Sequence, residues 1–310
     1  MTNSQLYYRH AGKAPLGGII IALLVGLVGA SILAVVYAFA IWYDPIAYLN
    51  IVICFVFGLL LAYMAGKGAK LGKIRSSGMA MFIAFVVALA ALYVHWAAYL
   101  TLLNHAGGAT SFGSGKNAIS IVGSSFDFMT FYYFLIHPME LSQVMQYLNM
   151  GGFWSYQNFT PTGMALWAMW GLEAAIIIIM ALYHVRQAAD KPFSEKAECW
   201  MEEDKLPASL AFFSDAQDTR RRLEQGDLSP VLQAQALTPE DKNTSRAKLS
   251  LYACSGDENA YLSVQNIEVR FTDKKQKKKK TTHTDVVKFL RLNKSGADKI
   301  RQQFGATCAY

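Results

Sequence analysis

The chain has 310 residues, of which 53% are hydrophobic and 16% are charged, and its formal net charge at pH 7 is +7. Charge is distributed unevenly, because residues 16–185 carry few charged side chains while residues 186–310 carry nearly all the acids and most of the bases. This pattern excludes one uniform soluble domain. It predicts a membrane region followed by a water-exposed domain.

Four apolar runs dominate the first 185 residues. A helix of about 20 apolar residues crosses the roughly 30 Å hydrocarbon core of a bilayer, and backbone amides in lipid must be paired within the helix. The first run is too long for the apolar core of a cleaved signal peptide. All four runs are longer than the helices that soluble proteins usually bury. We therefore predict a membrane all-α region of four transmembrane helices in residues 16–185, at Leu16–Tyr43, Ile46–Ala65, Met79–Leu103 and Met164–Val185.

Basic residues indicate the orientation. Lys and Arg gather before the first run, between the second and third, and after the fourth, which is the distribution typical of cytoplasmic segments. We expect an integral protein of a bacterial inner membrane, with residues 1–15 and the C-terminus both cytoplasmic. The basic residues are Arg9, Lys13, Lys67, Lys70, Lys73, Arg75, Arg186 and Lys191.

Small residues follow one face of each of the first three runs. In the first run they recur at every fourth position from Gly18 to Ala38, and small faces let helix backbones approach closely in lipid. The faces predict a tight bundle or the interface of a homo-oligomer, although Gly and Ala are also simply common in membrane helices. The candidate packing residues are Gly18, Ala22, Gly26, Ala30, Gly58, Ala62, Gly66, Ala84, Ala88 and Ala91.

Two connections differ in character. Residues 66–73 are rich in Gly and Lys but match no P-loop pattern, so we predict a short cytosolic turn. Residues 104–163 are long enough for a structured outer loop, with coil at 105–123, an aromatic cluster, and a short helix over Met139–Asn149 that begins after Pro138. This helix either lies on the outer leaflet or forms a lid or partner surface.

The polar tail predicts a linker at residues 186–206 and a cytosolic α+β domain at 207–310. The expected order is helix, strands, helix. The helices are Asp215–Gln225 and Ser295–Phe304, the latter capped by Ser295, and the strands are Lys248–Cys254, Tyr261–Phe271 and Val286–Leu292.

Two ionisable side chains in the spans are candidates for function. Glu173 and His95 each lie about 14 Å below the outer end of their run, at 1.5 Å per residue, so the two groups could face each other. A charge at that depth costs at least about 2.5–3.5 kcal/mol unless it is paired, protonated or hydrated. The pair predicts either a polar clasp that fixes helix register, or a ligand site or relay for protons or cations.

A lysine run lies between two predicted strands. It comprises Lys274, Lys275, Lys277, Lys278, Lys279 and Lys280. Such a run either stays solvated at a hairpin tip or contacts anionic lipid headgroups. Nucleic acid is disfavoured as a partner because no aromatic residues alternate with the lysines.

Motifs of common enzymes are missing from the sequence. It contains neither HExxH nor GxSxG, and the four cysteines show no paired spacing, so we expect no enzyme activity, cofactor, metal site or disulfide. The leading hypothesis is a non-enzymatic membrane anchor or scaffold that self-associates and presents its basic tail to a cytosolic protein or to the inner leaflet. The alternative is a small oligomeric ion or proton channel or transporter that uses Glu173 and His95, and a third is a membrane-bound enzyme.

Overall fold

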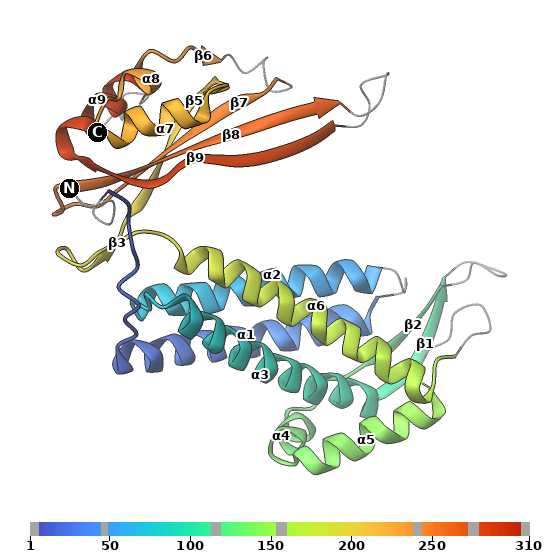
Figure 1. Cartoon of the computed structure of the whole chain (residues 1–310). Helices are drawn as coiled ribbons and strands as arrows, with labels where there is room; N and C mark the ends of the chain where they lie inside the picture. The colour runs from blue at the N-terminus through green and yellow to red at the C-terminus, as the bar shows by residue number, and fades with distance from the viewer. Residues whose placement is uncertain are drawn as a thin grey trace. The chain divides into compact units, whose positions relative to one another are not determined.

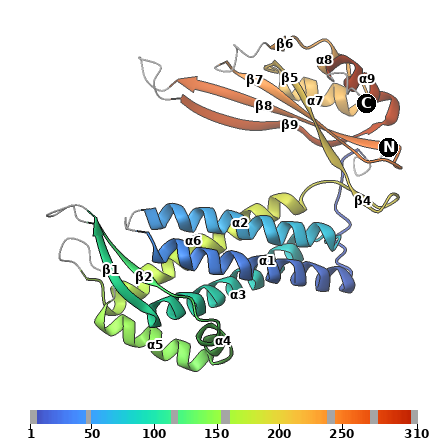
Figure 2. The same ribbon diagram turned by 180° about the vertical axis from the view of Figure 1, so that it is seen from behind.

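A computed structural model describes residues 6–44, 49–112, 119–152, 160–237, 244–271 and 279–304. The chain divides into two compact units. Residues 11–190 form one, called here the helical unit, and residues 1–10 together with 191–310 form the other, called the α+β unit. Figures 1 and 2 show the elements of each.

Four helices of the helical unit are long and apolar enough to cross a membrane, as predicted. The first helix presents its small residues inward and a row of large apolar side chains outward: Ile20, Leu24, Val28, Ile32 and Val36 are all exposed. A soluble protein would place polar groups on that surface, whereas lipid favours apolar ones. The helices are α1 (Leu16–Trp42), α2 (Leu49–Leu71), α3 (Ser77–Asn104) and α6 (Gly163–Ala189).

The predicted turn at residues 66–73 is wrong for most of its length, because α2 continues to Leu71. A Cβ atom added to Gly68 would lie 2.6 Å from the carbonyl oxygen of Ala22, and one added to Gly18 would lie only 1.9 Å from that of Gly72. The α1 and α2 backbones are therefore in direct contact at this end. This packing outweighs the cost of glycine in a helix, about 1 kcal/mol per residue.

The small-residue faces pack inside one chain. All ten candidate packing residues are buried within the bundle. Gly26 of α1 faces Val87 of α3, and Gly58 of α2 faces Ile177 and Met180 of α6. The faces therefore pack in a tight bundle, the first of the two alternatives, and self-association of the chain stays a prediction.

The long connection between α3 and α6 is more ordered than expected. Residues 105–123, predicted as coil, include β1 (Ala106–Phe112) and β2 (Ile119–Ser124), which pair antiparallel. The Trp42 indole N–H donates to the Val122 carbonyl at 3.0 Å, and the Ser124 hydroxyl donates to the Leu102 carbonyl at 2.6 Å. These contacts with the helix ends stabilise a hairpin that its Gly- and Ser-rich sequence does not signal.

The predicted helix after Pro138 is confirmed as α5 (Pro138–Gly151), and α4 (Phe128–Ile136) precedes it. Phe131 and Phe134 of α4 and Leu141 of α5 pack against the end of α3 around Leu102. The opposite side of these helices exposes large apolar residues, including Met129. The segment is thus amphipathic, as both interpretations of the loop require.

The α+β unit is an antiparallel sheet of strand order β6-β5-β7-β8-β9, with a separate small hairpin. The three predicted strands and two predicted helices are confirmed, but strand β5 (Glu202–Ala211) precedes the first helix. Residues 193–206, expected as linker, contain two short strands and the start of β5. The elements are β3 (Phe193–Ser194), β4 (Cys199–Trp200), β5 (Glu202–Ala211), α7 (Ala216–Glu224), α8 (Ser229–Leu232), β6 (Ala236–Leu237), β7 (Arg246–Ala253), β8 (Asn259–Phe271), β9 (Lys279–Asn293) and α9 (Lys294–Phe304).

The N-terminal arm, residues 6–8, pairs with the free edge of β9. The Arg291 amide donates to the Leu6 carbonyl at 2.7 Å, and the Tyr8 amide donates to the Phe289 carbonyl at 3.0 Å. Phe289 has a φ of 57°, within a bulge of β9, and this left-handed conformation is uncommon for a non-glycine residue. The arm covers an edge that would otherwise be open to pairing with other chains.

Tyr7 anchors this arm. Its hydroxyl donates to Glu224 Oε1 at 2.5 Å, and burial followed by this hydrogen bond raises the pKa of Tyr7 to about 12. The pKa of Glu224 is lowered by the same bond and by Arg220. The tyrosine therefore stabilises the folded unit below pH 10, and this contribution is lost as the pH rises from 10 to 12.

Tyr7→Phe removes the hydrogen bond to Glu224 and is expected to lower the free energy of unfolding of the α+β unit by about 1 kcal/mol. The effect is modest because solvent screens a half-buried hydrogen bond. The variant should also lose stability less steeply than wild type between pH 10 and 12. Urea unfolding of the full chain at several pH values measures both effects. An unchanged slope would show that Tyr7 titrates alike in the folded and unfolded states.

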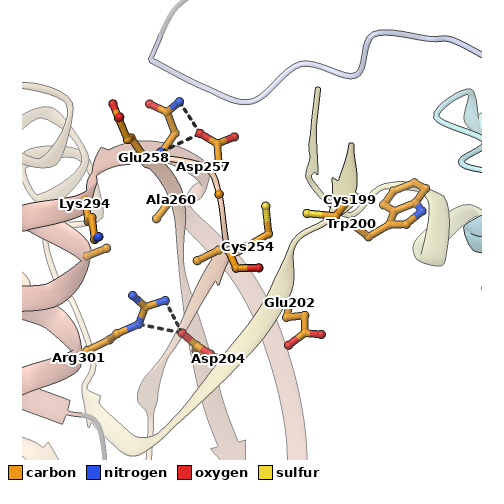
Figure 3. Close-up of a pocket in the computed structure, with 15 residues that line it drawn as sticks. Cys199, Trp200, Glu202, Asp204, Cys254, Asp257, Glu258, Ala260, Lys294 and Arg301 are labelled. Carbon is orange, nitrogen blue, oxygen red and sulfur yellow. Dashed lines mark hydrogen bonds and ion pairs between the residues drawn. The ribbon is translucent and has the colours of Figure 1, made fainter. Parts of the chain in front are cut away.

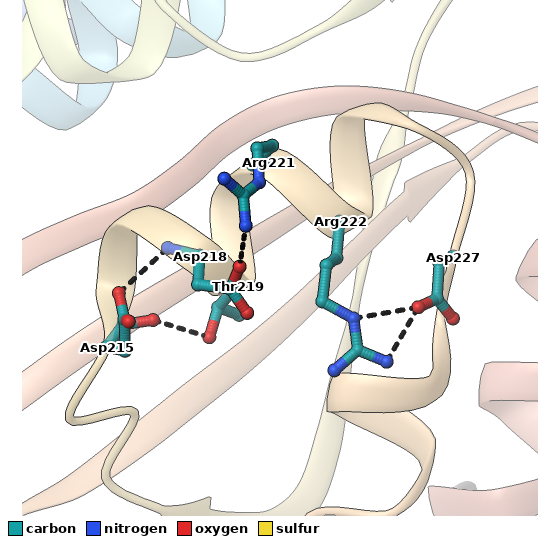
Figure 4. A network of polar contacts seen from close by, with 6 residues as sticks. All are labelled: Asp215, Asp218, Thr219, Arg221, Arg222 and Asp227. Atoms are coloured by element: carbon teal, nitrogen blue, oxygen red, sulfur yellow. Dashed lines mark hydrogen bonds and ion pairs between the residues drawn. The ribbon is translucent and has the colours of Figure 1, made fainter.

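Helix α7 begins at a side-chain cap (Figure 4). The Asp215 carboxylate accepts from the Asp218 amide at 2.8 Å, and Arg222 pairs with Asp227 at 2.7 Å beyond the other end of the helix. At α9 the predicted cap is corrected: Asn293, not Ser295, accepts from the Gly296 amide, at 2.8 Å. The helix begins one residue earlier than predicted, so the capping position moves with it.

Asp215→Ala is expected to cost about 1 kcal/mol of stability, the usual value for an N-cap. Asp215→Ser should retain most of the wild-type stability, since serine also accepts the bond from the amide. Urea unfolding of the full chain provides the comparison. If alanine and serine had equal effects, the cap would not contribute to stability.

Candidate functional site

Each of the four long apolar helices contributes one polar side chain to a buried cluster. Tyr37 comes from α1, Cys54 from α2, His95 from α3 and Glu173 from α6. We call these four residues the polar cluster. Tyr37, Cys54 and His95 are buried, and Glu173 is partly buried. Because helices from across the whole bundle supply it, the cluster exists only when all four have assembled.

Tyr37 is the centre of the cluster. Its hydroxyl donates to Glu173 Oε1 at 2.5 Å and lies 3.0 Å from Cys54 Sγ. Since a phenol has one hydrogen and an ionised carboxylate can only accept, the thiol donates to the tyrosine oxygen when Glu173 is ionised. The hydrogen bonds then run in one direction, from Cys54 through Tyr37 to Glu173.

Aromatic rings fix the position of Tyr37. Phe57 of α2 stacks on its ring with the centroids 4.2 Å apart and an interplanar angle of 3°. The His95 ring packs on it at 4.5 Å and 54°. His95 is 3% exposed, and its Nδ1 atom has no hydrogen-bond partner among the described residues. An unpaired polar atom at such a site costs about 1–3 kcal/mol.

The sequence placed Glu173 and His95 at a shared depth, and the structure brings both against Tyr37. No ion pair between them occurs among the described residues, so the tyrosine lies where direct contact was expected. Tyr37 was not among the predicted site residues, and Cys54 was not predicted to lie near the acid. The available signal was polarity alone, as both residues interrupt otherwise apolar helix segments.

The chemistry of the cluster is compatible with two roles. A hydrogen-bonded acid, phenol and thiol can hold helices in register, and the same groups can pass a proton along their bonds. The phenol oxygen is both donor and acceptor, which a relay requires. An orphan imidazole nitrogen beside it supplies a further acceptor or donor, depending on its tautomer.

The α+β unit contains a cavity of about 520 Å³. Figure 3 shows the sulfur atoms of Cys199 and Cys254 directed toward each other at its wall. Burial, followed by the hydrogen bond to Cys199, raises the pKa of Cys254 to about 11, so this thiol stays protonated at neutral pH and is a weak nucleophile. Arg301 is already bound to Asp204, with its Nε and Nη2 atoms 3.0 and 2.8 Å from Oδ2.

The lysine run joins β8 to β9, which pair up to Phe271 and Lys279. Lys274, Lys275, Lys277 and Lys278 lie outside the described residues, as does the side chain of Lys279. Lys280 is exposed on β9. The described part agrees with a connection between two antiparallel strands, and the proposed contact with anionic lipid stays a prediction.

In the described part of the chain, no group of three or more His, Cys, Asp or Glu side chains is placed to hold a metal ion. Comparisons with protein-family models, curated proteins and solved structures find no match to this chain. The function must therefore be argued from the arrangement of its own residues.

Proposed function

We propose that this protein is an integral membrane anchor that holds the α+β unit at the cytoplasmic face of a membrane. The observation that carries the proposal is the apolar outer surface of the bundle. Ile20, Leu24, Val28, Ile32 and Val36 form one continuous exposed row on α1, and each would lie in lipid. Exposing such a row to water would be unfavourable by about 25 cal/mol per Å².

The α+β unit supports the proposed topology. It combines residues 1–10 with residues 191–310, so both ends of the helical unit lead into the same folded body. Four crossings return the chain to the side on which it began, which satisfies this requirement. The basic residues near the ends of α2 and α6, including Lys67, Lys70 and Arg186, favour the cytoplasm as that side.

The anchor role is non-enzymatic. In the α+β cavity the raised pKa of Cys254 makes its thiol a weak nucleophile and Arg301 is bound to Asp204, and both observations support a structural role for these groups. The exposed basic strand β9, with Lys280 and Lys288, offers a surface to an acidic cytosolic protein or to the inner leaflet.

Membrane fractionation tests the proposal. We expect the full chain to remain in the membrane pellet after extraction with alkaline carbonate. We also expect a cysteine-reactive reagent that cannot cross the membrane to label Cys199 in inverted vesicles only, once the α+β unit has been denatured. Release by carbonate would overturn membrane insertion. Labelling of Cys199 in right-side-out vesicles would overturn the cytoplasmic assignment.

The polar cluster favours transport as a second candidate. Glu173, Tyr37 and Cys54 form a hydrogen-bonded series within the spans, and His95 adds an unpaired nitrogen. Proton flux in liposomes containing the purified chain separates the two candidates. Flux that Glu173→Gln abolishes would establish transport, whereas no flux above that of empty liposomes would support the anchor.

A further inference from the structure

A groove runs between α2 and α6 of the helical unit, with a volume of about 280 Å³. Its lining residues on α2 recur at helical spacing, so one side of that helix forms a continuous wall. Leu59, Ala62 and Tyr63 make its apolar part, and the Leu59 and Tyr63 side chains are 41% and 56% exposed. This wall is suited to a hydrocarbon chain.

Small residues form the floor of the groove. A Cβ atom added to Gly66 would lie 3.7 Å from the Cβ of Ala188, which is ordinary van der Waals contact. With glycine at this position the space remains open. A methyl group there fits beside Ala188, and a longer side chain would extend into the groove that Gly66 lines.

Basic groups lie at one end of the groove. Lys67, Lys70 and His184 line it, and no Asp or Glu occurs among the described residues of the lining. The Lys67 ammonium lies 5.3 Å from the centroid of the Tyr63 ring, which holds it over the groove. Lys67 follows Leu59 by about 12 Å along the helix axis, and it lies in the last turns of α2.

We propose that this groove binds an anionic phospholipid, with the headgroup phosphate between Lys67 and Lys70 and an acyl chain along Leu59 and Ala62. Basic pockets between helices at a cytoplasmic surface recognise anionic headgroups in this way. A free anion would not use the apolar wall, and a second copy would bring its own lysines against these. The inference rests on the membrane insertion proposed above.

Native mass spectrometry of the detergent-purified full chain tests the groove, using phosphatidylglycerol and phosphatidylcholine as the lipids. We expect phosphatidylglycerol to bind about 30-fold more tightly, which is the effect of two lysines near a headgroup. Lys67→Gln combined with Lys70→Gln should bring the ratio close to one. Lys294→Gln combined with Lys299→Gln, both on α9, removes the same charge from the α+β unit and should leave the ratio unchanged.

A second variant separates shape from charge. Gly66→Leu keeps every charge but fills the groove, so phosphatidylglycerol binding should fall by at least about tenfold. Ala188→Leu provides the same test from α6 if the first variant does not fold. The inference would be overturned if the wild-type chain bound both lipids equally, or if the two lysine double variants lost lipid selectivity equally. It would also be overturned if inorganic phosphate displaced phosphatidylglycerol. A chain that resists carbonate but lacks lipid selectivity would refute the groove and leave the anchor intact.

Discussion

Gly18→Val is expected to destabilise the helical unit by about 3 kcal/mol or more. The added side chain would clash with a backbone atom, and because no change of rotamer can relieve such a clash, the two helix backbones must move apart. A Cβ at this position would lie 1.9 Å from the Gly72 carbonyl oxygen, and the same addition at Gly72 would meet Gly18 at 2.1 Å. The contact is between two backbones, so the α1–α2 interface itself must open.

Gly17 provides a matched control for this prediction. It is the neighbouring residue of the same helix, and a Cβ there meets no atom within 4 Å. Gly17→Val is expected to change stability by less than about 0.5 kcal/mol, as exposed substitutions usually do. Thermal unfolding in detergent, followed by helical circular dichroism, compares the pair. Equal loss in both variants would contradict the close approach of α1 and α2.

Tyr37→Phe is expected to lower the stability of the helical unit by about 2–3 kcal/mol, since it leaves the Glu173 carboxylate without its donor in a low-dielectric site. Glu173→Leu should cost less, because Cys54 still pairs with the Tyr37 hydroxyl and lipid favours the apolar side chain. A larger loss of stability in Tyr37→Phe than in Glu173→Leu would show that the main cost is a carboxylate left without a donor, and not the loss of the hydrogen bond itself.

The double variant completes the measurement. With both groups removed, no unpaired carboxylate remains, so the combined cost should fall short of the sum of the single costs by about 2 kcal/mol. Tyr183→Phe is the control, since Tyr183 is an exposed tyrosine of α6 and its hydroxyl takes part in none of the cluster bonds. Additive costs for Tyr37 and Glu173 would show that the hydrogen bond contributes little.

The sequence alone indicated the elements whose signal is local. A run of about 20 apolar residues has few folded forms other than a membrane helix, so Leu16–Tyr43 and the three later runs appear as helices. Their ends lie close to the predicted ones except in α2, which continues past Ala65 to Leu71. Period-two alternation likewise located β7 and β8, and Pro138 marked the start of α5. Such patterns depend only on which side chains of one segment face water, lipid or the protein core.

Contacts between distant residues decided the rest. Glycines at 66 and 68 would suggest a turn, but α2 continues through them because Ala22, more than forty positions earlier, lies against Gly68. The same holds for the hairpin before α4 and for the N-terminal arm on β9, whose partners come from other parts of the chain.

For the candidate site, counting residues predicted that Glu173 and His95 lie at similar distances from the ends of their helices, but it did not predict their surroundings. Depth follows from counting residues along a helix, whereas the rotation of each helix about its axis depends on packing with its neighbours. That rotation placed Tyr37 between the acid and the imidazole and brought Cys54 to the same oxygen. The composition of the chain thus determined which segments are apolar, and tertiary packing determined which of their few polar groups meet.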